Sequence, residues 1–237
     1  MMDFKKKYFN FFTEGRDKNL ETSIKNKLAE REVKTISFLL ENFYDKHFFS
    51  NSNQLQILDL GCGDQLIKEP LEKKNTKYKG LDIEDLNLEN EKFPIDNDSI
   101  DLIVSVGLIE ALSSTDHFFM ECNRVLKKSG YIYLITPNWL KDYKNFYRNP
   151  FHKKPFTPDS LENTLKLSEF ENIRTFPGLR CKPKWFYEGK YRFEKAYYLF
   201  PFSGLNFINH KAQIINNKLI PSFLKGHSRS IIAIAQK

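Results

Sequence analysis

The residue types best suited to holding a ligand lie around one short turn. An apolar run, Ile57–Leu60, contains Asp59 and leads directly into Gly61-Cys62-Gly63. Glycines at such a place let the backbone pass close to a ligand as a strand turns into a helix. The nicotinamide fingerprint would need a third glycine where this chain has Leu66, so the turn does not favour NAD. The carboxylate of Asp59 can instead attract an ammonium group.

A second carboxylate follows at the distance expected for a neighbouring strand. Asp82 lies 21 residues after Gly61 and ends the apolar run Tyr78–Leu81. An acid at the tip of the second strand can accept hydrogen bonds from both hydroxyls of a ribose. Two carboxylates beside a glycine turn therefore suit an adenosine ligand with a cationic tail and no phosphate.

One histidine has a position that suggests catalysis. His152 lies in the loop 147–157, after a predicted strand and on the side where this kind of sheet binds substrates. A histidine titrates near neutral pH and can accept a proton from an attacking hydroxyl. A lone loop histidine is also often a surface or packing residue, so both interpretations stay open. The same loop and its approach are rich in cations: Lys141, Lys144, Arg148, Lys153 and Lys154.

Alternating apolar runs and helical patterns predict the elements that position these residues. A parallel α/β sheet is typical of this alternation. The predicted strands are Leu55–Leu60, Tyr78–Leu81, Ile100–Val106, Tyr131–Ile135, Asn172–Phe176 and Ser230–Ala235. A helix is predicted up to Leu126, with Lys127–Gly130 as its C-terminal cap, and another from Thr157-Pro158. Before Phe48 the spacing predicts amphipathic helix, interrupted once.

The charge is distributed unevenly over the 237 residues. The net charge is +7, and it divides into +2 for residues 1–48, −6 for 49–136 and +11 for 137–237. This asymmetry indicates an acidic part that handles one ligand and a basic part that faces an anion. A lysine-rich solvated surface would give the same count, and both interpretations stay open.

The cysteines and the apolar runs limit the class of protein. Cys62, Cys122 and Cys181 are too far apart for zinc pairs or a disulfide framework, so we expect no metal site and a cytoplasmic location. The N-terminus lacks the apolar stretch of a secretion signal. The most apolar run, Leu102–Leu112, is shorter than the roughly 20 residues that cross a bilayer.

Five ordered blocks resemble the class I S-adenosylmethionine-dependent methyltransferases, in their small-molecule branch. After the Asp59–Gly63 turn and Asp82 come Phe93–Asp101, Arg124–Gly130 and Thr136-Pro137-Asn138, similar to the family's "LPF.D.SFD", "RVLKPGG" and "TPN". The resemblance covers about Leu55 to Asn138. It implies a Rossmann-like α/β fold with a mostly parallel seven-stranded sheet and helices on both faces.

The resemblance also implies which residues contact S-adenosyl-L-methionine. Asp59, Leu60, Gly61, Cys62 and Gly63 would surround its methionine part, Asp82 its ribose and Ile83 its adenine. Glu89 and Asn90 would border the adenine edge, and Ser105 and Val106 the methyl sulfonium. Tyr147, Arg148 and His152 would contact the acceptor. Gln65 and Ala111 depart from the family pattern, which commonly has a small residue and a histidine there.

Two parts of the chain lie outside the core of this resemblance. We expect an N-terminal helical segment over residues 1–50, and a methyltransferase domain over 51–237. Residues 178–226 are basic and aromatic and show no clean period, so they are expected to form a cap inserted before the last strand.

The expected function is methyl transfer to a small molecule or glycan, with an anionic sugar-type acceptor methylated on oxygen. Cations among aromatics would hold such an anion. A quinone or lipid acceptor at a membrane surface is an alternative, as is a tRNA or rRNA acceptor, although the motif for methylating base amino groups is absent. From another class, the chain could be a non-catalytic scaffold that only binds the cofactor.

Overall fold

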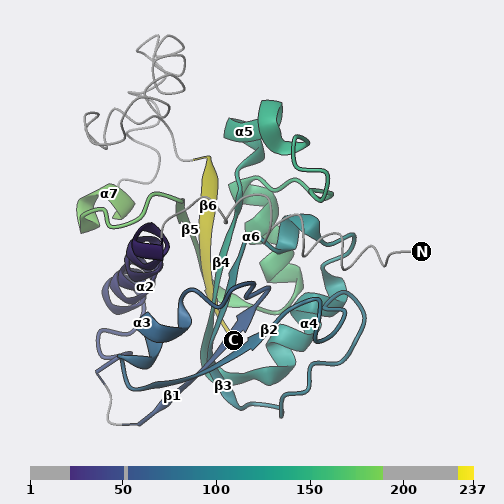
Figure 1. The fold of residues 1–237 in the computed structure, drawn as a ribbon. Helices are drawn as coiled ribbons and strands as arrows, with labels where there is room; N and C mark the ends of the chain where they lie inside the picture. Colours follow the sequence, from purple (N-terminus) through teal and green to yellow (C-terminus); the bar gives the residue numbers. More distant parts are fainter. Residues whose placement is uncertain (1–21, 51–52, 189–228) are drawn as a thin grey trace.

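The sheet lies at the centre of the molecule, with helices on both faces (Figure 1). The computed structural model describes residues 22–50, 53–188 and 229–237. The strands are β1 (Leu55–Leu60), β2 (Thr76–Leu81), β3 (Ile100–Val106), β4 (Leu126–Pro137), β5 (Glu171–Pro177) and β6 (Ser230–Gln236). All six predicted strands are thereby confirmed, with β4 longer than expected.

The strand order is β2-β1-β3-β4-β6-β5. Parallel pairing joins β1 to β2 and β3, and β3 to β4, while β6 is antiparallel to both of its neighbours. The mostly parallel Rossmann-like α/β fold is therefore confirmed. The described residues form six strands rather than the seven of the expectation, because the chain between β2 and β3 runs through turns and loops.

The helices divide into two layers. The helical elements are α2 (Thr22–Phe43), α3 (Lys68–Glu72), the 3-10 turn η1 (Ile109–Ala111), α4 (Asp116–Val125), α5 (Trp139–Phe146), α6 (Pro158–Leu167) and α7 (Lys184–Glu188). Helices α2, α3 and α7 lie on one side of the sheet and α4 and α6 on the other (Figure 1). In the described part of the chain, no helix is both long enough and apolar enough to cross a bilayer.

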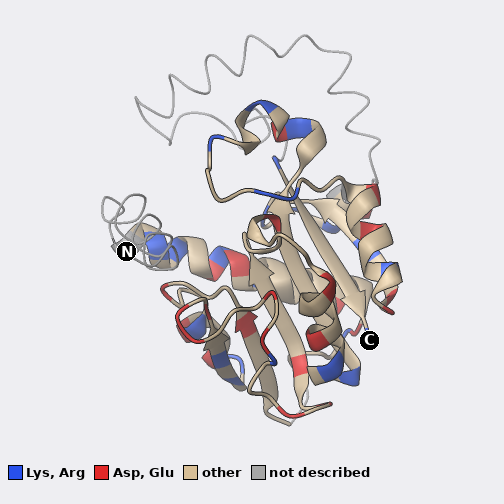
Figure 2. Ribbon diagram, turned by 90° about the vertical axis from the view of Figure 1, so that its right-hand side faces the viewer, with Lys and Arg blue, Asp and Glu red and all other residues tan. Residues whose placement is uncertain are grey.

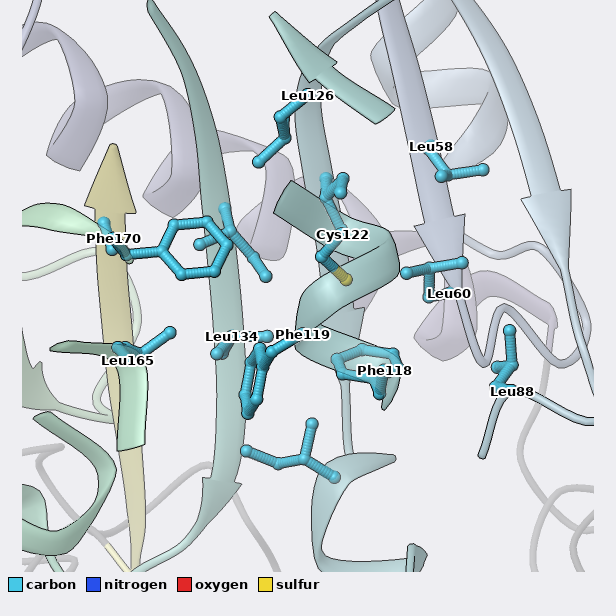
Figure 3. Close-up of a cluster of buried hydrophobic side chains, with 14 of the residues drawn as sticks. Leu58, Leu60, Leu88, Phe118, Phe119, Cys122, Leu126, Leu134, Leu165 and Phe170 are labelled. Atoms are coloured by element: carbon cyan, nitrogen blue, oxygen red, sulfur yellow. The ribbon is translucent and has the colours of Figure 1, made fainter. Parts of the chain in front are cut away.

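The sheet has a hydrophobic core on each face. Alternating residues of each strand contribute to the two cores, because successive side chains of a strand point to opposite faces. Leu58 packs in the cluster with Phe118 and Phe119 of α4 (Figure 3). Ile57, its neighbour in β1, joins the opposite cluster with Ile36 of α2. Helix α2 is thus an integral layer of the core.

One local prediction about the helices is wrong. Helix α4 ends at Val125, and Lys127–Gly130 belong to β4 instead of capping a helix. The β4 backbone pairs with β3 already at Leu126 opposite Ile100, and sheet pairing overrides the local cap pattern. Helix α2 is continuous from Thr22 to Phe43, and the interruption expected before Phe48 is not tested, because residues 1–21 lie outside the described part of the chain.

The prediction for α6 is confirmed. Thr157 caps the helix by accepting a hydrogen bond from the Ser160 backbone N–H, and the Ser160 hydroxyl accepts one from the Thr157 N–H in return. Pro158 occupies the first turn, where its missing N–H costs nothing. The predicted insert over residues 178–226 lies mostly outside the described residues, which end at Glu188 and resume at Arg229.

Candidate functional site

The carboxyl ends of four parallel strands meet along one edge of the sheet. Asp59 lies one residue before the end of β1 and Gly61 directly after it, Asp82 follows β2, and Val106 ends β3. The segment that carries His152 follows β4. In open α/β sheets ligands bind at this edge, where the strand order changes direction. A cavity of about 660 Å³ lies there, a size typical of small-molecule sites.

The wall of this cavity combines several distant segments. It includes the glycine turn, the loop after β2, the end of β3, the loop after α5, one face of α2 and the segment after β5. Of the residues expected to contact the cofactor, the wall includes Asp59, Gly61, Cys62, Gly63, Asp82, Ile83, Glu89 and Val106.

Three of the expected cofactor residues lie outside this wall. Leu60 is fully buried in the core, Asn90 is exposed, and Ser105 is buried with a hydroxyl that has no hydrogen-bond partner among the described residues. Two of the three expected acceptor residues, Tyr147 and Arg148, are exposed and also lie outside it. His152, the third, is part of the wall.

The glycine turn has a backbone that favours glycine. Gly61 has φ +73° and Gly63 has φ +48°, which non-glycine residues rarely adopt. A Cβ added to Gly61 would lie 3.0 Å from the Leu108 Cβ, whereas one on Gly63 would meet nothing within 4 Å. The turn therefore leaves open space beside Gly63, on the cavity side.

Asp59 is a buried acid in the cavity wall. Its side chain is 5% exposed, and the Tyr78 hydroxyl donates a hydrogen bond of 2.7 Å to Oδ2. Burial raises the pKa of Asp59 to about 7, and the nearby charge of Asp82 adds to this, while the Tyr78 bond opposes it. A cation bound beside Asp59 would favour the ionised carboxylate and return its pKa toward the ordinary range.

Asp82 is tied to the turn through both carboxylate oxygens. Oδ2 accepts from the Gly63 N–H and Oδ1 from the Ile83 N–H, each at 2.6 Å. A carboxylate has about four acceptor positions, so capacity for two further donors remains. This geometry fits a ligand with two adjacent hydroxyls, such as a ribose.

His152 and Glu110 lie next to each other in the cavity wall. Nδ1 of His152 lies 2.9 Å from the Phe146 carbonyl oxygen, and Nε2 lies 3.8 Å from Oε1 of Glu110. A carbonyl only accepts, so Nδ1 carries a proton, and in the neutral form of the ring the lone pair would lie on Nε2. Burial raises the pKa of Glu110 to about 7, although the Thr136 hydroxyl donates to it at 2.9 Å.

The sequence interpretation missed one part of the wall. Glu32 of α2 and Arg180 after β5 form an ion pair there, although 148 residues separate them. One signal was present in the sequence: Glu32 falls on the same helical face as Ala29, Val33 and Ile36, which are all buried. An acid on an apolar face is unusual and indicates a buried partner or a site.

Most of the charged residues that line the cavity, among the residues that the structure describes, are acidic. Its two cations, Lys153 and Arg180, pair with Glu89 and Glu32 respectively, at 3.6 Å for the first pair. The remaining carboxyl groups of the wall are Asp59, Asp64, Asp82 and Glu110. Exposed cations lie outside it, on α5 and the loop that follows, at the top of Figure 2. The cavity itself therefore suits a cationic or neutral ligand better than an anion.

Comparison with known proteins identifies the class that this fold and site define. A family described as "Methyltransferase domain" matches residues 23–175, which is more than half of the chain. The chain therefore belongs to this methyltransferase family. Its fold resembles that of an S-adenosylmethionine-dependent methyltransferase from Archaeoglobus fulgidus, with a TM-score of 0.55 and 20% identity over 87% of this chain and 94% of that one.

Two curated relatives share part of the sequence. The chain is 26% identical over 131 residues to a ubiquinone biosynthesis O-methyltransferase of Pelagibacter ubique, covering 46% of this chain and 55% of that protein. It is 30% identical over 100 residues to a probable S-adenosylmethionine-dependent methyltransferase of Mycobacterium tuberculosis, covering 41% and 36%. The chain thus spans about half the length, or less, of these relatives.

Proposed function

We propose that this protein transfers a methyl group from S-adenosylmethionine to a hydroxyl oxygen of a small molecule. The observation that carries the proposal is one cavity whose wall contains Asp59 and Asp82 around a glycine turn, together with the histidine–glutamate pair His152 and Glu110. S-Adenosylmethionine, when bound, supplies a methyl group on a sulfonium, which is already an activated electrophile. The protein must chiefly orient the acceptor and exclude water.

The cofactor residues are proposed on the basis of their geometry. Asp59 attracts the ammonium group, Gly61 and Gly63 allow close approach of the backbone, and both oxygens of Asp82 take the ribose hydroxyls. Ile83 and Leu88 supply apolar surface for the adenine, and Val106 borders the methyl group. Leu60, Asn90 and Ser105 stay predictions without support from the cavity wall.

His152 is proposed as the general base. Its Nε2 takes the proton of the acceptor hydroxyl, and Nδ1 keeps its own proton because it donates to the Phe146 carbonyl. Ionised Glu110, with Oε1 3.8 Å from Nε2, then stabilises the imidazolium. Because the pKa of Glu110 is raised to about 7, this support grows as the pH rises through 7.

The lining of the cavity favours an acceptor that is a largely neutral molecule with an apolar body. Leu28, Ala29, Leu112 and Phe151 contribute to its wall, and the cations there are paired with acids. The curated relative that methylates oxygen in ubiquinone biosynthesis agrees with a hydroxylated acceptor of this kind.

An anionic sugar-type acceptor is the second candidate. The observation that favours it is the pair of exposed cations, Lys144 and Arg148, near the loop that carries His152. Such an acceptor would place its anionic group outside the cavity wall. The basic insert that first suggested this acceptor lies mostly outside the described residues.

The test uses labelled S-adenosylmethionine and matched acceptors in which the hydroxyl is replaced by an amine. We expect label only in O-methyl products, and His152→Gln should lower kcat by roughly 10²- to 10⁴-fold while cofactor affinity stays unchanged. The control is His47→Gln, because His47 is exposed and is distant from His152 in the sequence. Cofactor binding without transfer to any acceptor would support the scaffold alternative and refute this proposal.

A further inference from the structure

A buried hydrogen-bond chain reaches the cavity wall. Glu32, on α2, is 5% exposed, and its Oε1 accepts a 2.6 Å hydrogen bond from the Tyr133 hydroxyl of β4. Its Oε2 accepts from Nε of Arg180, in the segment after β5. Both Glu32 and Arg180 belong to the cavity wall, whereas Tyr133 lies fully in the core.

These hydrogen bonds fix the position of the guanidinium group of Arg180. Burial and the charge of Glu32 raise the pKa of Tyr133 well above its usual range, so the phenol is neutral and can only donate to the carboxylate. Each oxygen of Glu32 therefore has one fixed donor, and the carboxylate is immobilised between β4 and the segment after β5. Arg180 is consequently held with its charge balanced by Glu32.

The guanidinium of Arg180 has more N–H donors than this hydrogen-bond network occupies. A guanidinium has five N–H donors. Among the described residues, Arg180 donates a hydrogen bond only from Nε, to Glu32. The side chain is 32% exposed, and Arg180 is one of the residues that line the cavity. Within the described part of the chain no group accepts a hydrogen bond from Nη of Arg180, and Leu28 and Ala29 of α2 line the same cavity.

We propose that Arg180 is an acceptor-binding residue, which donates from Nη to a neutral oxygen of the acceptor other than the oxygen that is methylated. Glu32 and Tyr133 are positioning residues for Arg180. The inference rests on the proposed function and narrows its acceptor class to molecules with at least two oxygens, such as adjacent hydroxyls or a hydroxyl beside a carbonyl. Glu32 cancels the charge of Arg180, so a neutral oxygen is preferred to a carboxylate.

A purely structural role for the pair predicts something different. If Glu32 and Arg180 only joined α2 to the segment after β5, substitutions would lower stability and weaken all acceptors alike. The proposal instead predicts a change in which acceptor is preferred, because removing Glu32 would leave the positive charge of Arg180 uncompensated.

The test measures affinities of three probes by calorimetry on the full chain saturated with S-adenosylhomocysteine. Catechol has two neutral oxygens, phenol has one, and salicylate has a carboxylate beside its hydroxyl. The proteins are wild type, Arg180→Gln and Glu32→Gln, with Arg31→Gln and Glu30→Gln as controls, because those two residues are exposed on the same helix α2. Thermal midpoints show whether each variant folds.

The proposal predicts that wild type binds catechol more tightly than phenol and salicylate. Arg180→Gln should lose about 10- to 100-fold in catechol affinity, the value of a hydrogen bond to a charged donor, with little change for phenol. Glu32→Gln should reverse the preference between catechol and salicylate. Both controls should behave as wild type.

Two results would contradict the role proposed for Arg180. If wild type and Arg180→Gln have equal affinities for all three probes, including no binding at all, the inference is overturned. It is also overturned if Glu32→Gln weakens all three equally. Methyl transfer to hydroxyl acceptors in wild type, measured separately, shows whether the proposed function itself survives such a result.

Discussion

The buried carboxylate of Asp59 makes cofactor affinity depend on pH in a predictable direction. The pKa of Asp59 is raised to about 7 in the unliganded protein, and a bound ammonium group would lower it. The ligand therefore prefers the ionised form, which is about 3% of the protein at pH 5.5 and about 75% at pH 7.5. Affinity should rise about 25-fold between these values, with most of the increase below pH 7.

The assay is calorimetric titration of S-adenosylhomocysteine at pH 5.5, 6.5 and 7.5 into wild type and Asp59→Asn. The amide cannot ionise, so Asp59→Asn should bind weakly and lose most of the pH dependence. Asp159→Asn, which changes an exposed acid on α6, is the control and should follow wild type. A wild-type affinity that is flat over this range, or an Asp59→Asn variant with the same slope as wild type, would refute the reasoning.

Three further predictions concern stability and the acceptor. Phe118→Ala, in the α4 core, should lower the free energy of unfolding by about 3–5 kcal/mol in urea titrations, while the exposed control Met120→Ala should change it little. Arg124→Ala leaves buried Glu121 without its charged partner and should cost about 3 kcal/mol or more by the same measurement; a loss below 1 kcal/mol would contradict this. Raising salt from 50 to 300 mM should leave the KM of a neutral acceptor nearly constant, whereas a steep rise would favour the anionic candidate.

Local patterns were sufficient to predict the strands and the glycine turn. Each strand is a short apolar run, and Gly61 and Gly63 have the positive φ angles that such a turn requires. The boundary at Lys127–Gly130 could not be predicted in this way, because pairing of Leu126 with Ile100 decides it. The described residues form six strands, one fewer than the resemblance implied.

The candidate site was predictable only where its residues follow strand ends. Asp59, Asp82 and His152 are of this kind, and all three belong to the cavity wall. Glu32 and Arg180 come together through tertiary packing of segments 148 residues apart, which no local period encodes. The sequence did contain one indication of this pair, because Glu32 is an acid on the buried face of an amphipathic helix.

The central claim is that the turn around Asp59 and Asp82 binds S-adenosylmethionine. The most direct test is calorimetric titration of S-adenosylmethionine and S-adenosylhomocysteine into wild type and Asp82→Ala, with NAD as a control ligand. We predict one site in wild type, roughly a hundredfold loss of affinity in Asp82→Ala from the missing ribose hydrogen bonds, and no NAD binding. Absence of binding in wild type, or a preference for NAD, would contradict the account.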